Sequence, residues 1–237
     1  MKPNPTTWLL AVAFSAIAVP RVQAYEVSPV TGGGTIKGMV TFNGDVPMKQ
    51  VIPTKDVEVC GAPREDPLIR VGPDKAVESA VVYLTQVPKG KEWPPPGKPP
   101  EIDNVKCRFV PEVQVIRPGS LDVVNTDPVL HNTHGFYGKR TAFNLALPNK
   151  DQRIPVELKR PGTVHVECDA HGWMEGWVYV VDNPYYAVTA PDGKFTISDV
   201  PAGDYTLVVA QAYVGTVEQT VTVKGGESTD LTIELKK

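Results

Sequence analysis

The sequence predicts an all-β protein built from two β-sandwiches, and three observations lead to that prediction. Apolar residues alternate with polar ones in short runs rich in Val, Thr and Ile, the period-2 pattern of half-buried strands. The 24 prolines and 20 glycines among 237 residues divide these runs, as turns divide the strands of a sandwich. No long stretch after residue 24 has the periodicity of a helix.

Residues 1–24 are typical of a secretory signal peptide. Lys2 precedes an apolar run from Trp8 to Val19, and Ala24 is a small residue at the expected cleavage point. The run is short for a bilayer span, and an uncleaved anchor is the alternative. Cleavage would remove two of the 24 basic residues and leave 22 against 27 acidic ones, a net charge of −5. We therefore expect a periplasmic or secreted protein with no nucleic-acid partner and no stable membrane insertion.

The chain between the signal peptide and residue 100 predicts two strands and two loops. In residues 34–42 apolar side chains alternate with polar ones, and residues 80–84 are continuously apolar. Each range predicts a strand. Residues 51–73 mix proline, charge and a cysteine, so we expect an extended loop there. Residues 89–100 are rich in proline, which indicates a surface loop.

Residues 107–182 predict a meander of short strands. The strand that begins near residue 163 alternates, so that Val164, Val166 and Cys168 share one face. The Cys168 thiol therefore points into the core at the end of its strand.

A Cys-x-x-His-x-x-Met pattern follows, formed by Cys168, His171 and Met174 on a strand–loop–strand. Residues 121–125 predict another strand, which runs into an Asp-Pro turn that ends at His131 and supplies a second imidazole. One thiolate, two imidazoles and a weak axial thioether are the ligand set of a trigonal blue-copper site. Zinc is the alternative metal, but it prefers more thiolates or a water-open set and does not choose Met.

These motifs resemble those of the cupredoxins, the small blue copper proteins, and among them the amicyanin and plastocyanin type. The loop pattern and the distant His-Asn-Thr-His-Gly-Phe at residues 131–136 carry the resemblance, which covers about residues 105–182. The resemblance implies a Greek-key sandwich with one copper ion. It implies these ligands: His131, Cys168 and His171 in the equatorial plane, and Met174 on the axis. It also implies that the backbone at Asn132 hydrogen-bonds near the thiolate.

The resemblance implies a single-electron carrier rather than an enzyme. In the family, electrons pass through the exposed edge of the second imidazole, here His171, to a transient protein partner such as a dehydrogenase or a cytochrome. The sequence departs from the pattern at Gly172, which predicts a looser loop, and at Glu175, a competing carboxylate. Two other functions stay open: copper storage or delivery with the same ligands, and a structural or binding module whose site is not redox-active.

Neighbouring aromatic and histidine residues have less specific roles. We expect His134 to be a solvent-facing loop residue, and His165 to lie on the strand face opposite Cys168. Trp173 and Phe136 either shield the metal or pack locally.

Cys60 and Cys107 remain as a pair once Cys168 is taken as a ligand. In an oxidising compartment we expect a disulfide between them, and the alternative is two free, buried thiols.

The sequence changes character after residue 182 and resembles the carboxypeptidase regulatory-like β-sandwich. The runs Asp-Gly-Lys-Phe-Thr-Ile and Val-Pro-Ala-Gly-Asp-Tyr-Thr-Leu carry this resemblance, and the Gly-Thr-Ile-x-Gly-x-Val strand that usually opens such a domain lies at residues 34–40. The resemblance implies that the copper domain is inserted into a split sandwich, which close termini make tolerable. Three sequential pieces are the alternative. The predicted division is a signal peptide at 1–24, the first part of the regulatory-like sandwich with its Pro-rich loop at 33–100, a cupredoxin domain at 101–182, and the remainder of the regulatory-like sandwich at 183–237.

Overall fold

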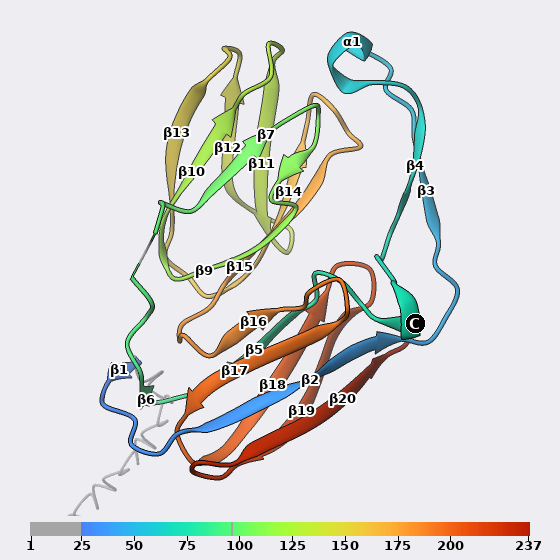
Figure 1. Cartoon of the computed structure of the whole chain (residues 1–237). Coiled ribbons are helices and arrows are strands. Elements are labelled where there is room, and N and C mark those ends of the chain that lie inside the picture. Colours follow the sequence, from blue (N-terminus) through green and yellow to red (C-terminus); the bar gives the residue numbers. More distant parts are fainter. Residues whose placement is uncertain (1–24, 96) are drawn as a thin grey trace, which may run out of the picture.

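Two β-sandwiches make up the structure, a computed structural model that describes residues 25–95 and 97–237 (Figure 1). The predicted signal peptide lies outside the described residues. Within those ranges, no helix is long and apolar enough to cross a membrane. The α-helix described, α1 (Val57–Cys60), has four residues and nearly everything else with regular structure is strand, so the all-β prediction is confirmed.

The lower sandwich in Figure 1, here called the terminal sandwich, takes strands from both ends of the described chain. These strands are β2 (Gly34–Phe42), β5 (Val81–Thr85), β16 (Tyr186–Val188), β17 (Lys194–Val200), β18 (Gly203–Gln211), β19 (Gly215–Val223) and β20 (Ser228–Leu235). One sheet has the order β16-β5-β18-β19 and the other has the order β17-β2-β20. β2 therefore lies between strands that follow it by more than 150 residues, with Ile36 opposite Ile197 on one side and Thr229 on the other.

The upper sandwich, here called the central sandwich, is continuous in sequence. Its strands are β7 (Glu101–Asn104), β8 (Phe109–Val110), β9 (Val113–Ile116), β10 (Gly119–Asn125), β11 (His131–Tyr137), β12 (Arg140–Leu147), β13 (Gln152–Leu158), β14 (Gly162–Cys168) and β15 (Glu175–Val180). The sheets have the orders β13-β10-β7-β8 and β12-β11-β14-β15-β9, and the chain crosses from one sheet to the other as in a Greek key. The central sandwich thus lies, in sequence, between two groups of strands that pair with each other.

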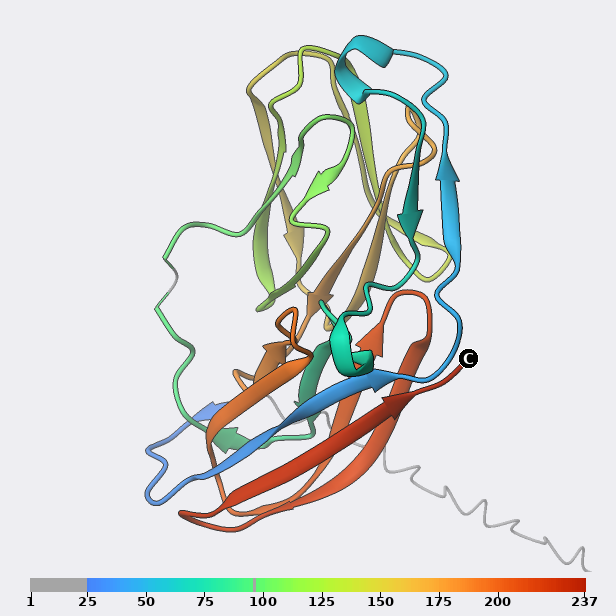
Figure 2. The same ribbon diagram turned by 45° about the vertical axis from the view of Figure 1, so that its right-hand side comes forward.

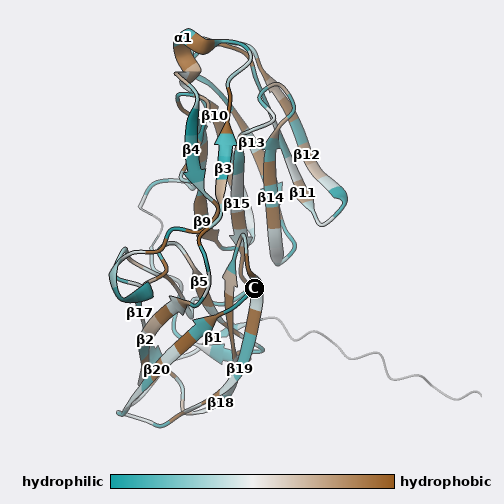
Figure 3. Ribbon diagram, turned by 90° about the vertical axis from the view of Figure 1, so that its right-hand side faces the viewer, coloured by the Kyte–Doolittle hydropathy of each residue, from teal (hydrophilic) through white to brown (hydrophobic). Residues whose placement is uncertain are grey.

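The alternating runs face the two cores. Ile36 and Val40 of β2 are buried in the terminal core, and Val164, Val166 and Cys168 of β14 are buried in the central one. Figure 3 shows the resulting alternation of brown and teal along the strands. Burial of each Val or Leu side chain contributes roughly 1.5–3 kcal/mol, so these inward faces account for much of the stability.

The two sandwiches meet through a small apolar cluster. Val81 and Ala210 of the terminal sandwich are buried against Tyr179 of the central one, with Trp177 partly buried beside them. Three further short elements are described outside the two sandwiches. The strands β1 (Glu26–Val27) and β6 (Lys89–Gly90) pair in parallel, and a 3-10 turn, η1 (Pro73–Lys75), precedes β5.

Residues 48–67 form an arm that leaves the terminal sandwich and runs alongside the central one (Figure 2). β3 (Met48–Val51) and β4 (Arg64–Pro67) pair antiparallel, and α1 lies at the tip of the arm. The predicted extended loop over residues 51–73 is therefore wrong in part. The two strands read Met-Lys-Gln-Val and Arg-Glu-Asp-Pro and bury only Val51, so they lack the apolar alternation on which the prediction depended.

Candidate metal centre

Strand pairing brings the first predicted imidazole next to the thiol. β11 begins at His131, β14 ends at Cys168, and the two strands are antiparallel neighbours with Thr133 opposite Cys168. The turn before β11 is held by Asn125, whose side-chain amide donates to the carbonyls of Val129 and Leu147 at 2.9 Å each. The backbone around His131 is therefore fixed by the sandwich itself.

The loop after Cys168 folds back through two successive turns. The His171 amide donates to the Cys168 carbonyl at 3.1 Å, and the Met174 amide donates to the His171 carbonyl at 2.9 Å. As a result all three side chains are buried at one place, with exposed fractions of 1% for Cys168, 0% for His171 and 2% for Met174. Gly172 lies within the second of these turns, between His171 and Met174.

Three donor atoms converge. The Cys168 Sγ lies 3.7 Å from the Nδ1 of His131 and 3.7 Å from the Nδ1 of His171, and the two Nδ1 atoms lie 3.1 Å apart. The Asn132 amide donates to the Cys168 Sγ at 3.4 Å, at the position that the sequence indicates for it. Sulfur and two nitrogens thus face one another in a buried space.

Each imidazole is held from behind by a carboxylate. The Nε2 of His131 lies 2.9 Å from Oδ2 of Asp127, and the Nε2 of His171 lies 2.9 Å from Oδ2 of Asp56. A carboxylate only accepts hydrogen bonds, so each ring carries its proton on Nε2 and presents a bare Nδ1 lone pair inward. Two lone pairs and a sulfur that face each other are the arrangement that a bound cation stabilises.

Burial shifts the pKa values of two of these groups, His131 and Cys168. Burial lowers the pKa of His131, and the hydrogen bond to Asp127 opposes that shift. Burial raises the pKa of the Cys168 thiol, and the backbone amides that point at the sulfur oppose it. Burial therefore disfavours the charged forms of His131 and Cys168.

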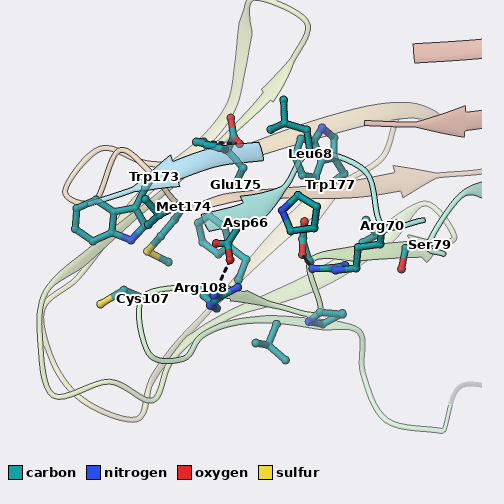
Figure 4. A pocket seen from close by; sticks show the side chains of 18 of the residues that line it. Asp66, Leu68, Arg70, Ser79, Cys107, Arg108, Trp173, Met174, Glu175 and Trp177 are labelled. Atoms are coloured by element: carbon teal, nitrogen blue, oxygen red, sulfur yellow. Dashed lines mark hydrogen bonds and ion pairs between the residues drawn. The ribbon is translucent and has the colours of Figure 1, made fainter. Parts of the chain in front are cut away.

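Met174 packs in the same buried cluster as Cys168 and Val166, with Trp173 partly buried beside it. Figure 4 shows Met174 and Trp173 at one end of a pocket of about 450 Å³ between the arm and the central sandwich. Met174 thus belongs both to the core around Cys168 and to the lining of this pocket.

Other predicted site residues lie elsewhere. His134 is in strand β11 rather than a loop; its side chain is 15% exposed, pairs with Asp169 at 3.2 Å and stacks on Phe136. His165 stacks on Trp177. The competing carboxylate, Glu175, pairs instead with Lys49 of the arm at 2.8 Å. Trp173 does lie beside the site, with its ring centre 5.1 Å from that of His171.

The expectation of an exposed His171 edge is wrong for this structure. The side chain of His171 is fully buried, and the tip of the arm covers the Nε2 edge of its ring. Asp56 contacts the Nε2 atom there, and the sulfur of Cys60 lies within 4.8 Å of a ring nitrogen.

The expected disulfide is present and joins Cys60 of the arm to Cys107 of the central sandwich, with 5.0 Å between the Cα atoms. It lies close to both imidazoles, because Cys107 is also within 4.8 Å of donor atoms of Asp127 and His131.

Sequence reasoning missed the two carboxylates, for different reasons. Asp127 belongs to the Asp-Pro turn four residues before His131, so a local signal was available. Asp56 lies 115 residues from His171, in a segment without a recognisable pattern.

Comparison with protein families matches residues 177–236 to the carboxypeptidase regulatory-like domain. The match begins in β15 and runs through the C-terminal strands of the terminal sandwich. Comparison with curated proteins gives no significant match.

Several solved copper proteins are similar to part of the chain. Amicyanin from Paracoccus versutus is 21% identical with a TM-score of 0.33, over 36% of this chain and 84% of amicyanin. A purple cupredoxin from Nitrosopumilus maritimus is 22% identical with a TM-score of 0.31, over 35% of this chain and 99% of that protein. A copper-containing nitrite reductase from Thermus scotoductus is 20% identical with a TM-score of 0.32, over 36% of this chain and 23% of the reductase. The chain thus spans about a quarter of the length of the reductase.

Proposed function

We propose that this chain is a type 1 copper protein that carries single electrons. The observation that carries the proposal is the convergence of one thiol sulfur and two imidazole Nδ1 atoms within 3.7 Å of one another, with a buried methionine on the same loop. This donor set fits copper, whereas zinc does not select a thioether. His131, Cys168 and His171 would hold the ion, with Met174 as a weaker fourth ligand. Copper held there would supply one-electron chemistry by changing between its Cu(II) and Cu(I) states.

The chain's own residues prepare this site. Backbone hydrogen bonds of the β11–β14 pair and of the double turn fix the donors, so that little rearrangement is needed when charge changes. The Asn132 amide stabilises negative charge on the Cys168 sulfur. The surrounding apolar core, including Val166 and Leu147, excludes water from the donors.

We further propose that the protein is an exported carrier rather than an enzyme, and that it exchanges electrons with a redox protein through a small, transient interface. The signal peptide predicted at residues 1–24 and the disulfide between Cys60 and Cys107 support export, because disulfides persist in oxidising compartments.

Copper storage or delivery is a second candidate, and one observation favours it. The buried His171 edge gives a partner no direct contact with that imidazole. The two functions differ in rate: a carrier exchanges electrons rapidly between its Cu(II) and Cu(I) forms, whereas a storage protein releases copper to a chelator and exchanges electrons slowly.

The first experiment is a visible absorption and EPR spectrum of the mature protein after addition of one equivalent of Cu(II). We expect an intense blue thiolate-to-copper band with narrow hyperfine splitting, and loss of that band in the Cys168→Ser variant. A colourless wild-type protein would exclude a type 1 site, and a blue Cys168→Ser variant would exclude this ligand assignment. The electron self-exchange rate, measured by NMR line broadening in mixtures of the two redox states, then distinguishes a carrier from a storage protein.

A further inference from the structure

The arm brings a side chain to the metal centre from outside the central sandwich. It starts at β2 and returns to β5, both strands of the terminal sandwich, and its tip lies at the far end of the central sandwich (Figures 1 and 2). Val59 and Cys60 at this tip pack into the core that also contains Cys168 and Met174. The tip is therefore part of the wall of the site.

Several links hold the arm in place. The disulfide joins its tip to Cys107, and Lys49 pairs with Glu175 directly after Met174 at 2.8 Å. Asp66 on the returning strand accepts from Arg108 at 3.1 Å. Covalent and ionic contacts thus fix both strands of the arm against the central sandwich.

Asp56 is the residue of the arm that reaches His171. Its carbonyl accepts from the amides of Val59 and Cys60 at 2.9 and 2.8 Å, which ties its backbone to the disulfide-bonded turn. Its backbone has a φ of 50°, in the left-handed region that Asp tolerates better than most residues. Its carboxylate accepts from the His171 Nε2 at 2.9 Å, and among the described residues this is the one recorded hydrogen bond of that carboxylate.

We propose that Asp56 is a positioning residue for the His171 ligand, and that the arm caps the metal centre through it. The carboxylate keeps the ring proton on Nε2, turns Nδ1 toward Cys168 and His131, and makes that nitrogen a stronger donor. It also places a negative charge one ring away from the ion, which favours Cu(II) over Cu(I). The inference rests on the proposed copper function, and its test includes a measurement without metal.

Three variants separate the effects of contact and charge. Asp56→Asn keeps an acceptor oxygen but removes the charge, and Asp56→Ala removes both. Glu58→Gln is the matched control, because Glu58 is an exposed acidic residue two positions away on α1 with no recorded contact to His171. Each variant is compared with wild type for Cu(II) affinity by chelator competition, for midpoint potential and for its EPR spectrum.

We expect Asp56→Ala to lower Cu(II) affinity by about 10–100-fold, the usual effect of removing such a partner. Asp56→Asn should retain the blue band and shift the midpoint potential to a more positive value. Glu58→Gln should leave affinity, potential and spectrum unchanged. Equal affinity and potential in wild type and Asp56→Ala, or an equal shift in Glu58→Gln, would overturn the positioning role.

The metal-free protein provides a separate measurement. A hydrogen-bonded His171 Nε2 proton should give a slowly exchanging, downfield NMR signal in wild type and in Glu58→Gln, and that signal should vanish in Asp56→Ala. If wild type fails to bind copper but shows this signal, the proposed function fails and the imidazole–carboxylate contact stands. If the signal is absent from wild type, the positioning role fails whatever the copper spectrum shows.

Discussion

The two imidazoles of the candidate metal centre are each held by a carboxylate, but the two carboxylates come from different parts of the molecule. His131 donates to Asp127, which is buried in the preceding turn, whereas His171 donates to Asp56, which is 36% exposed and comes from a distant arm. Asp127 also accepts from the amides of Lys106 and Cys107, at 2.7 and 2.9 Å. The carboxylate that contacts His131 thus belongs to the central sandwich, whereas the one that contacts His171 belongs to the arm. This difference predicts that changes in the arm will affect the surroundings of His171 without affecting those of His131.

The largest expected effect comes from removing the anchor of the arm. The Cys60→Ser, Cys107→Ser double variant opens a loop with a sequence separation of 47, and we expect a loss of about 4 kcal/mol in the free energy of unfolding. In the folded state the tip of the arm should move away, so that diethylpyrocarbonate modifies His171 but not His131. Urea unfolding and mass spectrometry of the modified peptides measure both. Equal protection of the two rings would show that the arm stays docked without the disulfide.

The next largest effect is expected at Asp127, the carboxylate that belongs to the central sandwich. Asp127→Ala leaves His131 and the amides of Lys106 and Cys107 without their acceptor, and each unsatisfied buried group costs about 1–3 kcal/mol. We expect unfolding free energy to fall by at least about 3 kcal/mol, measured by urea denaturation. Asp127→Asn, which keeps one acceptor oxygen, should lose less. A smaller loss for Asp127→Ala than for Asp56→Ala would reverse the comparison.

Removal of the Asp56 carboxylate, which belongs to the arm, should cost little stability. Asp56→Ala removes one hydrogen bond from a partly exposed carboxylate, so we expect the free energy of unfolding to fall by only about 1 kcal/mol. The same urea experiment measures it, with Glu58→Gln as control. A loss as large as that of Asp127→Ala would mean that Asp56 supports the fold as much as it supports the ligand.

The smallest effect concerns the outer ion pair of the arm. Lys49 and Glu175 are each about one-third exposed, and such pairs contribute roughly 0–1 kcal/mol. We expect Lys49→Ala to change unfolding free energy by less than about 0.5 kcal/mol and to leave His171 protected from diethylpyrocarbonate. Modification of His171 in this variant would show that the ion pair, and not the disulfide, holds the cap.

The sequence was sufficient for those features that depend on local pattern. Alternating runs such as β2 and β14 predicted strands, because each has one face in a core. The Cys168, His171 and Met174 loop could be predicted from spacing alone, and the structure brings it to His131 through strand pairing. The pair of cysteines was predicted from parity and compartment.

The cap could not be predicted, because its position depends on contacts that no local pattern encodes. The arm strands lie on the surface of the central sandwich and have no apolar face of their own. Asp56 contacts His171 across 115 residues of sequence, from a segment that the Cys60–Cys107 disulfide anchors. The resemblance to cupredoxins predicted an exposed His171 edge, whereas the arm contacts that edge and the side chain is buried.

The split of the terminal sandwich has a consequence for the order of folding. β2 finds its partners only among β17 and β20, near the end of the chain, whereas the strands of the central sandwich pair mostly with near neighbours in sequence. Local pairing is kinetically favoured, so the central sandwich should form first, with His171 uncovered. Both ends of the arm are attached to strands of the late-forming sandwich, which makes Asp56 one of the last groups to arrive. Between these two steps, the candidate metal centre would stay open to solvent on its His171 side.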